Sequence, residues 1–334
     1  MDFIAGVDGG GTKTKVVCAS PEGKVLDTAV FGPFNMNSIG AERFSALLQE
    51  LCAYLNGLGD CRALCIGSAG ISNKEMTRIV ETEMTRGGIE NWKLVGDQVI
   101  ALNGALSGEA GIALIAGTGS NDTRHAIAQS REAEALGADA LLLVTPYYNK
   151  CTQGGLVRYY SEIAECTKLP IIMYNEPGRT GCNILPETAA KIFKEVENVV
   201  AIKEATGSVA QASQLMYLTD GRIDLYSGED GIVVPLMAIG AIGVISVWSN
   251  VAPAKVHGMC QSFFDGDLQT AMKIQREAQP LVSALFSEVN PIPVKKALNL
   301  MGREVGTLRS PLTEMTDANA AVLADAMKAY GILD

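Results

Sequence analysis

The sequence predicts an α/β protein composed of two regions with different patterns of strands and helices, followed by a helical tail. The chain has 334 residues, which is enough for about two domains of ~150 residues each. Hydrophobic residues make up 48% of the chain and charged residues 19%, a composition typical of globular proteins. The changes of pattern along the chain divide it into residues 1–116, 117–266 and 267–334.

Residues 1–116 read as short strands and glycine turns, followed by helices. The strands are apolar or alternate between apolar and polar residues, and the helices are amphipathic. We expect helices at 41–55 and 73–86, and strands at 3–8, 13–20, 24–32, 62–70 and 111–116. A Gly/Thr turn, GGGT, follows the first strand, and a Gly/Thr/Ser loop, GTGS, follows the last one.

Residues 117–266 alternate between helices and short, nearly continuous apolar runs. The helices span about 124–136, 156–166 and 185–196, and the runs are ALLLVTP, LPIIMYN, VVAIKE, IDLYSG and AIGVISV. Such runs are buried on both faces, which is typical of parallel sheets. Repeated β–α units over this length favour a barrel or a doubly wound sheet. Residues 267–334 show only helical patterns.

The charge and hydropathy of the chain argue against nucleic acid and membrane partners. With 27 Lys and Arg against 37 Asp and Glu, the net charge is −10, so the basic surface that phosphate backbones require is missing. Residues 231–254 carry no charge and are long enough to span a bilayer. However, Pro235, Gly240 and Asn250 interrupt this stretch, so we interpret it as a buried helix followed by a buried strand.

The N-terminus and the cysteines indicate a cytoplasmic location. The opening segment, MDFIAGVDGG, lacks the basic region and apolar core of a secretory signal. The eight cysteines are scattered, and Cys61 with Cys65 alone does not make a zinc site. We therefore expect reduced thiols, no metal and a soluble cytoplasmic protein.

Polar side chains end several apolar strands of the second region. Lys203 ends VVAIK, Tyr174 ends LPIIMY with Arg179 five residues beyond it, and Tyr147 and Tyr148 follow ALLLVTP. The C-terminal ends of strands hold the active sites of parallel β–α folds. A lysine desolvated there has a lowered pKa and forms Schiff bases with carbonyls, while a tyrosine relays protons and an arginine binds a carboxylate. This pattern indicates a class I aldolase acting on an α-keto acid.

A structural interpretation of the same residues is also open. Lys203 at a strand end is equally consistent with an ion pair to its neighbour Glu204. Tyrosines at strand ends are often rim or interface residues rather than catalytic ones.

Residues 112–334 resemble the 4-hydroxy-tetrahydrodipicolinate synthase family, formerly called dihydrodipicolinate synthase, which belongs with the N-acetylneuraminate lyases. The segments that carry the resemblance are GTGSNDTRHAI, ADALLLVTPYYNK, YNEPGRTG, VVAIKEATG, LYSGED, GVISVWSNVAP and FSEVNPIPVKKALNLMG. The resemblance implies a (βα)8 TIM barrel that condenses pyruvate with aspartate 4-semialdehyde, the reaction that begins diaminopimelate and lysine synthesis. It also implies that the reaction needs no metal or organic cofactor, and that the chain forms a homo-oligomer.

The resemblance also implies a role for individual residues. Lys203 matches the Schiff-base lysine, Tyr174 the proton-relay tyrosine, and Tyr148 the tyrosine contributed across a tight dimer interface. Arg179 in PGRTG is similar to the arginine that binds the carboxylate of aspartate semialdehyde, which favours the synthases over the neuraminate lyases. Two further positions match residues that line the pyruvate site, Gly228 and Ile245.

The match begins at the third strand of the barrel, AGTGSND, so the first two β–α units of the family are absent. With them goes a loop of GTTGE type, whose threonine links the two tyrosines of the proton relay. Ser68 in CIGSAGIS offers a hydroxyl, but its spacing to AGTGS is longer than in the family. We therefore expect an incomplete barrel with two unpaired strand edges and impaired turnover.

The turn DGGGTKT after the first strand is a candidate phosphate-binding loop. Its backbone N–H groups and hydroxyls suit a phosphate, and Asp8 suits a hydrated Mg²⁺. The arrangement is not GxxxxGK[ST], so it is not a Walker P-loop, and a structural hairpin explains it equally well.

Residues 1–120 resemble the first half of the sugar-kinase, actin and heat-shock ATPase superfamily, with an actin-like (ribonuclease H-like) fold. The matching segments are GVDGGGTKTKVV, GPFNMN, CIGSAGIS, VGDQVIALNGAL and GIALIAGTGS, and they are most similar to N-acetylglucosamine kinase and the benzoyl-CoA-reductase activator ATPases. The second domain of that family is absent, so we expect Mg-ATP binding only if this half functions by itself. The implied nucleotide-site residues are Asp8, Gly10, Gly11, Thr12, Asp97, Gly117, Thr118 and Gly119, with Asn35 as a substrate contact.

Both resemblances include the string IAGTGS at 115–120, so the chain reads as two truncated proteins joined there. We expect residues 111–117 to pair with the N-terminal sheet and also to begin the remnant barrel. The preferred function is the Schiff-base lyase. The alternatives are an ATP-dependent amino-sugar kinase or activator ATPase, and an inactive chimera in which neither site works.

Overall fold

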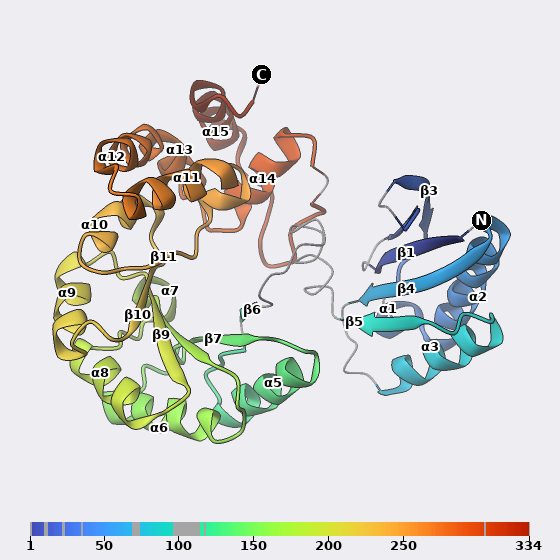
Figure 1. The fold of residues 1–334 in the computed structure, drawn as a ribbon, viewed down its shortest axis with the longest axis horizontal. Coiled ribbons are helices and arrows are strands. Elements are labelled where there is room, and N and C mark those ends of the chain that lie inside the picture. Colours follow the sequence, from blue (N-terminus) through green and yellow to red (C-terminus); the bar gives the residue numbers. More distant parts are fainter. Residues whose placement is uncertain are drawn as a thin grey trace. The chain divides into compact units, whose positions relative to one another are not determined.

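The computed structural model describes residues 2–9, 13–21, 24–34, 36–68, 74–95, 114–116, 118–303 and 305–333. The chain divides into two compact units, which Figure 1 shows as a ribbon. The first unit comprises Met1–Ile115 with Arg131–Ala140, and the second comprises Ala116–Ser130 with Leu141–Asp334.

The first unit contains a five-stranded sheet of order β3-β2-β1-β4-β5. Its strands are β1 (Asp2–Gly9), β2 (Thr14–Ala19), β3 (Val25–Phe31), β4 (Asp60–Ser68) and β5 (Trp92–Val95). The β1 strand pairs antiparallel with β2 and parallel with β4. Along β1, buried residues alternate with more exposed ones, so that Phe3, Ala5 and Val7 face the core. The sequence pattern predicts all of these strands except β5.

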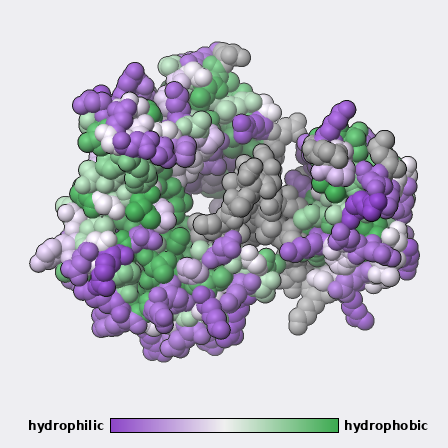
Figure 2. Space-filling view, viewed as in Figure 1, coloured by the Kyte–Doolittle hydropathy of each residue, from purple (hydrophilic) through white to green (hydrophobic). Residues whose placement is uncertain are grey.

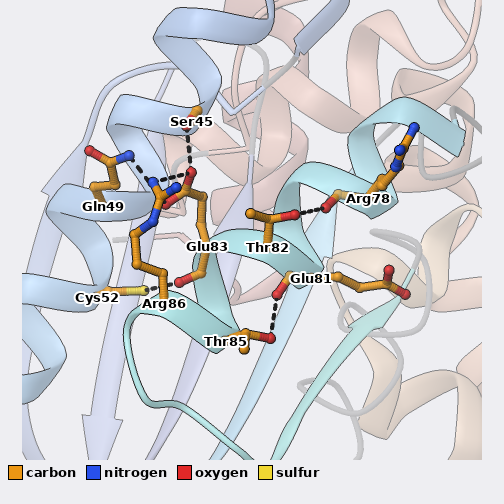
Figure 3. Close-up of polar contacts among 9 residues, drawn as sticks. All are labelled: Ser45, Gln49, Cys52, Arg78, Glu81, Thr82, Glu83, Thr85 and Arg86. Carbon is orange, nitrogen blue, oxygen red and sulfur yellow. Dashed lines mark hydrogen bonds and ion pairs between the residues drawn. The ribbon is translucent and has the colours of Figure 1, made fainter.

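The described residues 36–86 of this unit also contain helices α1 (Met36–Ile39), α2 (Ala41–Leu58) and α3 (Lys74–Arg86). Apolar residues of α2 and of the strands form its core, in which the rings of Phe34 and Phe44 lie 4.9 Å apart, edge to face. Figure 3 shows the polar contact between α2 and α3, where buried Glu83 accepts hydrogen bonds from Ser45 Oγ at 2.8 Å and Gln49 Nε2 at 3.2 Å. Arg86 on α3 completes the cluster, with its Nη1 3.0 Å from Glu83 Oε1.

A six-stranded sheet, most of whose residues belong to the second unit, has sequence neighbours as spatial neighbours, from β6 to β11. The pairs from β7 to β11 are all parallel, as the continuous apolar runs predict. The strands are β6 (Leu114–Ala116), β7 (Ala140–Val144), β8 (Ile171–Asn175), β9 (Val199–Glu204), β10 (Asp224–Ser227) and β11 (Gly243–Val244).

Helices cover the outer side of this sheet and form the C-terminal tail (Figure 1). In Figure 2 the outer helices carry many hydrophilic residues, whereas the strands lie in a more hydrophobic region. The helices are α5 (Thr123–Ala135), α6 (Gln153–Ala164), α7 (Pro177–Thr180), α8 (Pro186–Glu195), α9 (Val209–Leu218), α10 (Val233–Met237), α11 (Pro253–Phe264), α12 (Leu268–Glu277), α13 (Gln279–Leu285), α14 (Ile292–Leu300) and α15 (Asp317–Tyr330).

The expectation that residues 111–117 pair with both sheets falls partly outside the described ranges, which leave out residues 111–113 and 117. In the described part, Leu114–Ala116 forms strand β6, whose neighbour is β7, and the described five-stranded sheet ends at β5. The expectation that the tail is helical throughout is wrong, because the described residues 305–316 between α14 and α15 contain no helix. Pro311 in this segment lacks the N–H that a helix interior requires.

The uncharged stretch 231–254 folds as expected into a short helix and a short strand, α10 and β11. Two single turns of 3-10 helix, Asp230–Ile232 and Trp248–Asn250, flank them. Of the helices in the described ranges, none combines the length and the apolar character needed to cross a membrane.

Candidate active site

The C-terminal ends of three neighbouring strands bring polar side chains to one face of the second sheet. In the strand register, Tyr174 on β8 pairs with Lys203 on β9, and Lys203 pairs with Tyr226 on β10. Residues paired across parallel strands point to the same face, so the three side chains form a row. The Nζ atom of Lys203 lies 4.1 Å from the centroid of the Tyr174 ring. The structure thus brings together two of the residues that the sequence predicts to be catalytic.

The surroundings of Lys203 favour its neutral form. Burial lowers the pKa of the amine, and the positive charge of Arg179 lowers it further, while the carboxylates of Asp230 and Glu176 oppose the shift. A lysine with a lowered pKa has a larger fraction of neutral amine near neutral pH, and the neutral amine is the nucleophile that attacks a carbonyl. The site therefore suits Schiff-base chemistry.

The ion pair between Lys203 and Glu204 that the sequence leaves open is not formed in the described part of the chain. Adjacent residues of a strand point to opposite faces, so Glu204 lies on the face away from Lys203. Its Oε1 atom accepts a hydrogen bond from the Thr206 N–H at 2.7 Å, and its Oε2 atom accepts one from Asn175 Nδ2 at 3.3 Å. Burial raises the pKa of Glu204.

Gly228, directly after β10, provides the backbone surface against which Lys203 packs. A Cβ atom at this position would lie 2.7 Å from Ala205 Cβ and 3.0 Å from both Cγ and Cε of Lys203. The 2.7 Å separation is shorter than real Cβ contacts, and at 3.0 Å the lysine side chain must shift by a few tenths of an ångström to make room for a Cβ atom. Ile245 follows β11 and donates its N–H to the Ser227 carbonyl at 2.9 Å. Both predicted pocket positions therefore follow strands on the same side of β9, Gly228 after β10 and Ile245 after β11.

Arg179 lies on the short helix α7, directly after β8. Its Nη1 donates to the Asn290 carbonyl at 3.2 Å, and its Nε lies 3.7 Å from Glu176 Oε2. About half of the side chain is exposed (47%), so the guanidinium is accessible to a ligand and still acts on the pKa of Lys203.

Tyr148 lies apart from the row formed by Tyr174 and Lys203. Its side chain is 89% exposed, and its backbone has a positive φ of 74°. The Tyr148 N–H donates to the Thr180 carbonyl at 3.2 Å, which ties its loop to the loop of Arg179. In the residues that the structure describes, no hydrogen bond or ring contact joins Tyr148 to Tyr174.

Asp230 and Glu176 are charged site residues that the sequence analysis does not single out. Asp230 is buried, and its Oδ2 accepts the N–H groups of Val247 at 3.0 Å and Trp248 at 2.8 Å. Its negative charge is the largest influence that raises the pKa of Lys203. Both residues could have been predicted from the acidic residues in LYSGED and YNEPGRTG, each of which is close in sequence to a predicted site residue.

The predicted nucleotide-site residues are described only in part. Asp8 is exposed near the end of β1 and belongs to the first unit, whereas Thr118 and Gly119 are buried in the second unit. A Cβ on Gly119 would lie 2.6 Å from the backbone N and O of Val144, so the glycine allows close packing on β7. The predicted residues that lie outside the described ranges are Gly10, Gly11, Thr12, Asn35, Asp97 and Gly117.

Two protein families match this chain. Residues 96–330 match the dihydrodipicolinate synthetase family, and residues 5–140 match the BadF/BadG/BcrA/BcrD ATPase family. The 4-hydroxy-tetrahydrodipicolinate synthase of Lachnoclostridium phytofermentans is 55% identical over 222 residues, which cover 66% of this chain and 76% of that protein.

Solved structures of the same kind of enzyme are also similar. Dihydrodipicolinate synthase from Thermotoga maritima superposes with a TM-score of 0.67 at 37% identity, covering 85% of this chain and 92% of that one. A chloride-inhibited dihydrodipicolinate synthase from Acinetobacter baumannii, in complex with pyruvate, gives a TM-score of 0.63 at 36% identity. The superposition covers 86% of this chain and 92% of that one.

Proposed function

Because the chain belongs to the dihydrodipicolinate synthetase family, we propose that it is a lyase that condenses pyruvate with aspartate 4-semialdehyde through a Schiff base on Lys203. The observation that carries this proposal is the half-buried amine of Lys203, which lies 4.1 Å from the Tyr174 ring at the ends of parallel strands. The similar enzyme from Acinetobacter baumannii was solved with pyruvate, which supports the choice of the first substrate.

The chemistry follows from the neutral amine. Its lone pair attacks the keto carbon of pyruvate, water leaves, and a protonated imine remains on Lys203. Loss of a proton from the pyruvate methyl group gives an enamine, whose carbon attacks the aldehyde carbon of the second substrate. We assign proton transfer to Tyr174 and binding of the aldehyde's carboxylate to Arg179. The imine nitrogen is the electron sink, so we propose that this reaction needs no metal or organic cofactor.

We also propose that turnover is impaired. No GTTGE-type loop is present in the sequence, and the Lachnoclostridium synthase is matched over 76% of its length. A missing relay hydroxyl slows proton transfer, for which a positioned acid or base contributes typically 10²–10⁴-fold. Imine formation itself needs only the amine and the keto acid, so we expect it to survive.

The test is reductive trapping with pyruvate and sodium borohydride, followed by peptide mass spectrometry. We expect one reduced adduct, on Lys203. The variant Lys203→Met should form none, whereas Lys191→Met, which removes an exposed lysine of α8, should form as much as the wild-type chain. Folded wild-type protein without an adduct, or with an adduct elsewhere, would overturn the proposal.

A second candidate function belongs to the first unit, because residues 5–140 match an ATPase family. In that case Mg-ATP should raise the thermal stability of the protein and pyruvate should not, since a ligand stabilises only the state that binds it. Stabilisation by neither compound would favour the inactive chimera. Phosphorylation of an amino sugar at the expense of ATP would favour the kinase.

We further propose that copies of the chain associate. The exposed Tyr148 side chain lies on a loop hydrogen-bonded to the Arg179 loop, where a second copy can contact it. Sedimentation velocity tests this: the wild-type chain should sediment as an oligomer, and a monomer at all concentrations would contradict the proposal.

A further inference from the structure

Two opposite charges lie next to each other beside Lys203, and the proposed reaction uses only one of them. Glu176 and Arg179 both belong to the turn that follows β8, and Nε of Arg179 lies 3.7 Å from Oε2 of Glu176. The positive charge lowers the pKa of Lys203 and the negative charge raises it, so both act at the reacting amine. They have the same opposite effects on the pKa of Tyr174.

The two side chains differ in how well they are paired. The guanidinium is 47% exposed and has a good hydrogen bond to the Asn290 carbonyl at 3.2 Å. The Glu176 side chain is only 14% exposed, and its Oε2 atom is buried without a hydrogen bond. A separation of 3.7 Å is an ion pair but is too long for a hydrogen bond. A buried carboxylate oxygen that lacks a donor is costly, so a donor that reaches it contributes to binding.

The second substrate proposed above carries charges that complement this pair. Aspartate 4-semialdehyde has a carboxylate and an ammonium group on the same carbon, at the end of the molecule away from its aldehyde. Arg179 suits the carboxylate as a planar donor, and the remaining ammonium has three N–H donors and needs an acceptor. Glu176 is the charged acceptor next to Arg179.

We propose that Glu176 is a specificity-determining residue that binds the ammonium group of the amino-aldehyde substrate while Arg179 binds its carboxylate. This inference rests on the proposed function and names the group of the substrate that Glu176 recognises. Binding replaces the long ion pair between the two side chains by two shorter pairs with the substrate, and it gives the buried Oε2 atom a donor. An aldehyde without the ammonium group leaves that oxygen unpaired and binds less tightly.

A purely structural role for the same residues is an ion pair that stabilises the turn of α7. The two roles predict different results, because a structural pair is indifferent to the amino group of the substrate. Glu176→Gln keeps the size of the side chain and removes its charge. Arg179→Gln should weaken the binding of aldehydes with and without the amino group, because both carry the carboxylate. Glu187→Gln on α8, whose exposed carboxylate accepts a hydrogen bond from Gln214, is the matched control.

The experiment compares aspartate 4-semialdehyde with succinic semialdehyde, which has the same carboxylate and aldehyde but no amino group. Wild-type chain and variants are loaded with pyruvate, and a single turnover is followed by mass spectrometry over a range of aldehyde concentrations. For the wild-type chain we expect half-saturation at about tenfold lower concentration of the amino aldehyde, and Glu176→Gln should abolish that preference. Glu187→Gln should retain it.

Three outcomes would overturn the inference. A wild-type chain without preference for the amino aldehyde is one, and a Glu176→Gln variant that keeps the preference is another. In both cases the pyruvate adduct on Lys203 still forms, so the proposed function stands. If no pyruvate adduct forms on the wild-type chain, the proposed function fails and this inference fails with it. The adduct on Glu176→Gln serves as the check that the variant is folded.

Discussion

At the scale of single residues, the chemical environment of the Lys203 amine depends on the residues around it more than on its position at the end of a strand. The Tyr174 ring lies on one side of the amine, the backbone of Gly228 packs against the side chain, and Asp230 is the carboxylate with the largest effect on the pKa of the amine. Each neighbour has a separate effect on the amine. The ring and backbone remove water, whereas the carboxylate limits how far desolvation can lower the pKa.

The first prediction concerns the packing surface at Gly228. In Gly228→Ala the new methyl group would lie 3.0 Å from Lys203 Cγ and Cε, so the lysine must move. We expect a loss of about 1–3 kcal/mol in unfolding free energy and a strong reduction in trapped pyruvate adduct. Both are measurable, by chemical denaturation and by mass spectrometry.

The control for this variant is Gly258→Ala in the interior of α11, where a Cβ meets no atom within 4 Å. It should raise the unfolding free energy by roughly 0.5–1 kcal/mol, because alanine loses less backbone entropy in a helix. Equal effects of the two substitutions would show that Gly228 is not a packing surface for the lysine.

The second prediction concerns pH. An unperturbed lysine has a pKa of about 10.4, and burial lowers the pKa of Lys203 below that value. The folded chain therefore loses this proton at lower pH than an exposed lysine does, and the rate of imine trapping should rise with pH with a midpoint below 10.4. A midpoint at or above that of a model lysine peptide would contradict the desolvated environment.

At the scale of elements, Tyr148 and Arg179 lie in the segments that follow β7 and β8, and each of these segments also carries a cysteine. The sulfur atoms of Cys151 and Cys182 lie 3.7 Å apart, although both thiols are free. We predict that oxidised glutathione converts this pair to a disulfide and is itself reduced. The reaction should be slow, because burial raises the pKa of Cys182 to about 12 and little thiolate is present.

Mass spectrometry of the oxidised chain under non-reducing conditions checks this prediction. Cys151→Ser should prevent the cross-link, and Cys260→Ser, which removes a cysteine of α11, should not affect it. Exclusive formation of mixed disulfides with glutathione would show that the two sulfurs do not reach bonding distance.

The contact between α2 and α3 depends on the buried carboxylate of Glu83 (Figure 3). In Glu83→Ala the hydroxyl of Ser45 and the amide of Gln49 lose their acceptor. We therefore expect chemical denaturation to show a loss of about 1–3 kcal/mol in unfolding free energy. Glu81→Ala, on the exposed face of the same helix, should change stability by less than about 0.5 kcal/mol. Similar changes in unfolding free energy in both variants would show that the buried hydrogen bonds of Glu83 add nothing to stability, because alanine favours the helix at both positions.

At the scale of the whole molecule, the chain consists of two compact units, and proteins of more than one unit often unfold in more than one step. We predict two calorimetric transitions. Pyruvate at about 100 times its dissociation constant should stabilise the second unit by about 2.7 kcal/mol, because only that unit contains Lys203. Glu83→Ala should lower the transition temperature of the first unit. A single transition that shifts under both treatments would show that the units unfold together.

The helices and strands follow closely from local sequence patterns. Continuous apolar runs predict β7 to β10, and amphipathic periodicity predicts α2, α3 and α5 to within a few residues. The short strand β5 and the choice of sheet that β6 joins could not be predicted in the same way. A strand of four residues carries little periodicity, and which sheet a strand joins depends on packing between distant segments.

By itself, the sequence determined the α/β class and the family, and it singled out Lys203 and Tyr174, which the structure places next to each other in the candidate site. Periodicity and motif are properties of neighbouring positions, so a linear reading is sufficient for them. Only the tertiary structure decided which charges surround the amine. It turns Glu204 away because adjacent strand residues face opposite sides, and it brings Asp230 and Glu176 close enough to act on Lys203. Electrostatic interactions depend on distance and burial in space, and neither is a property of the sequence order.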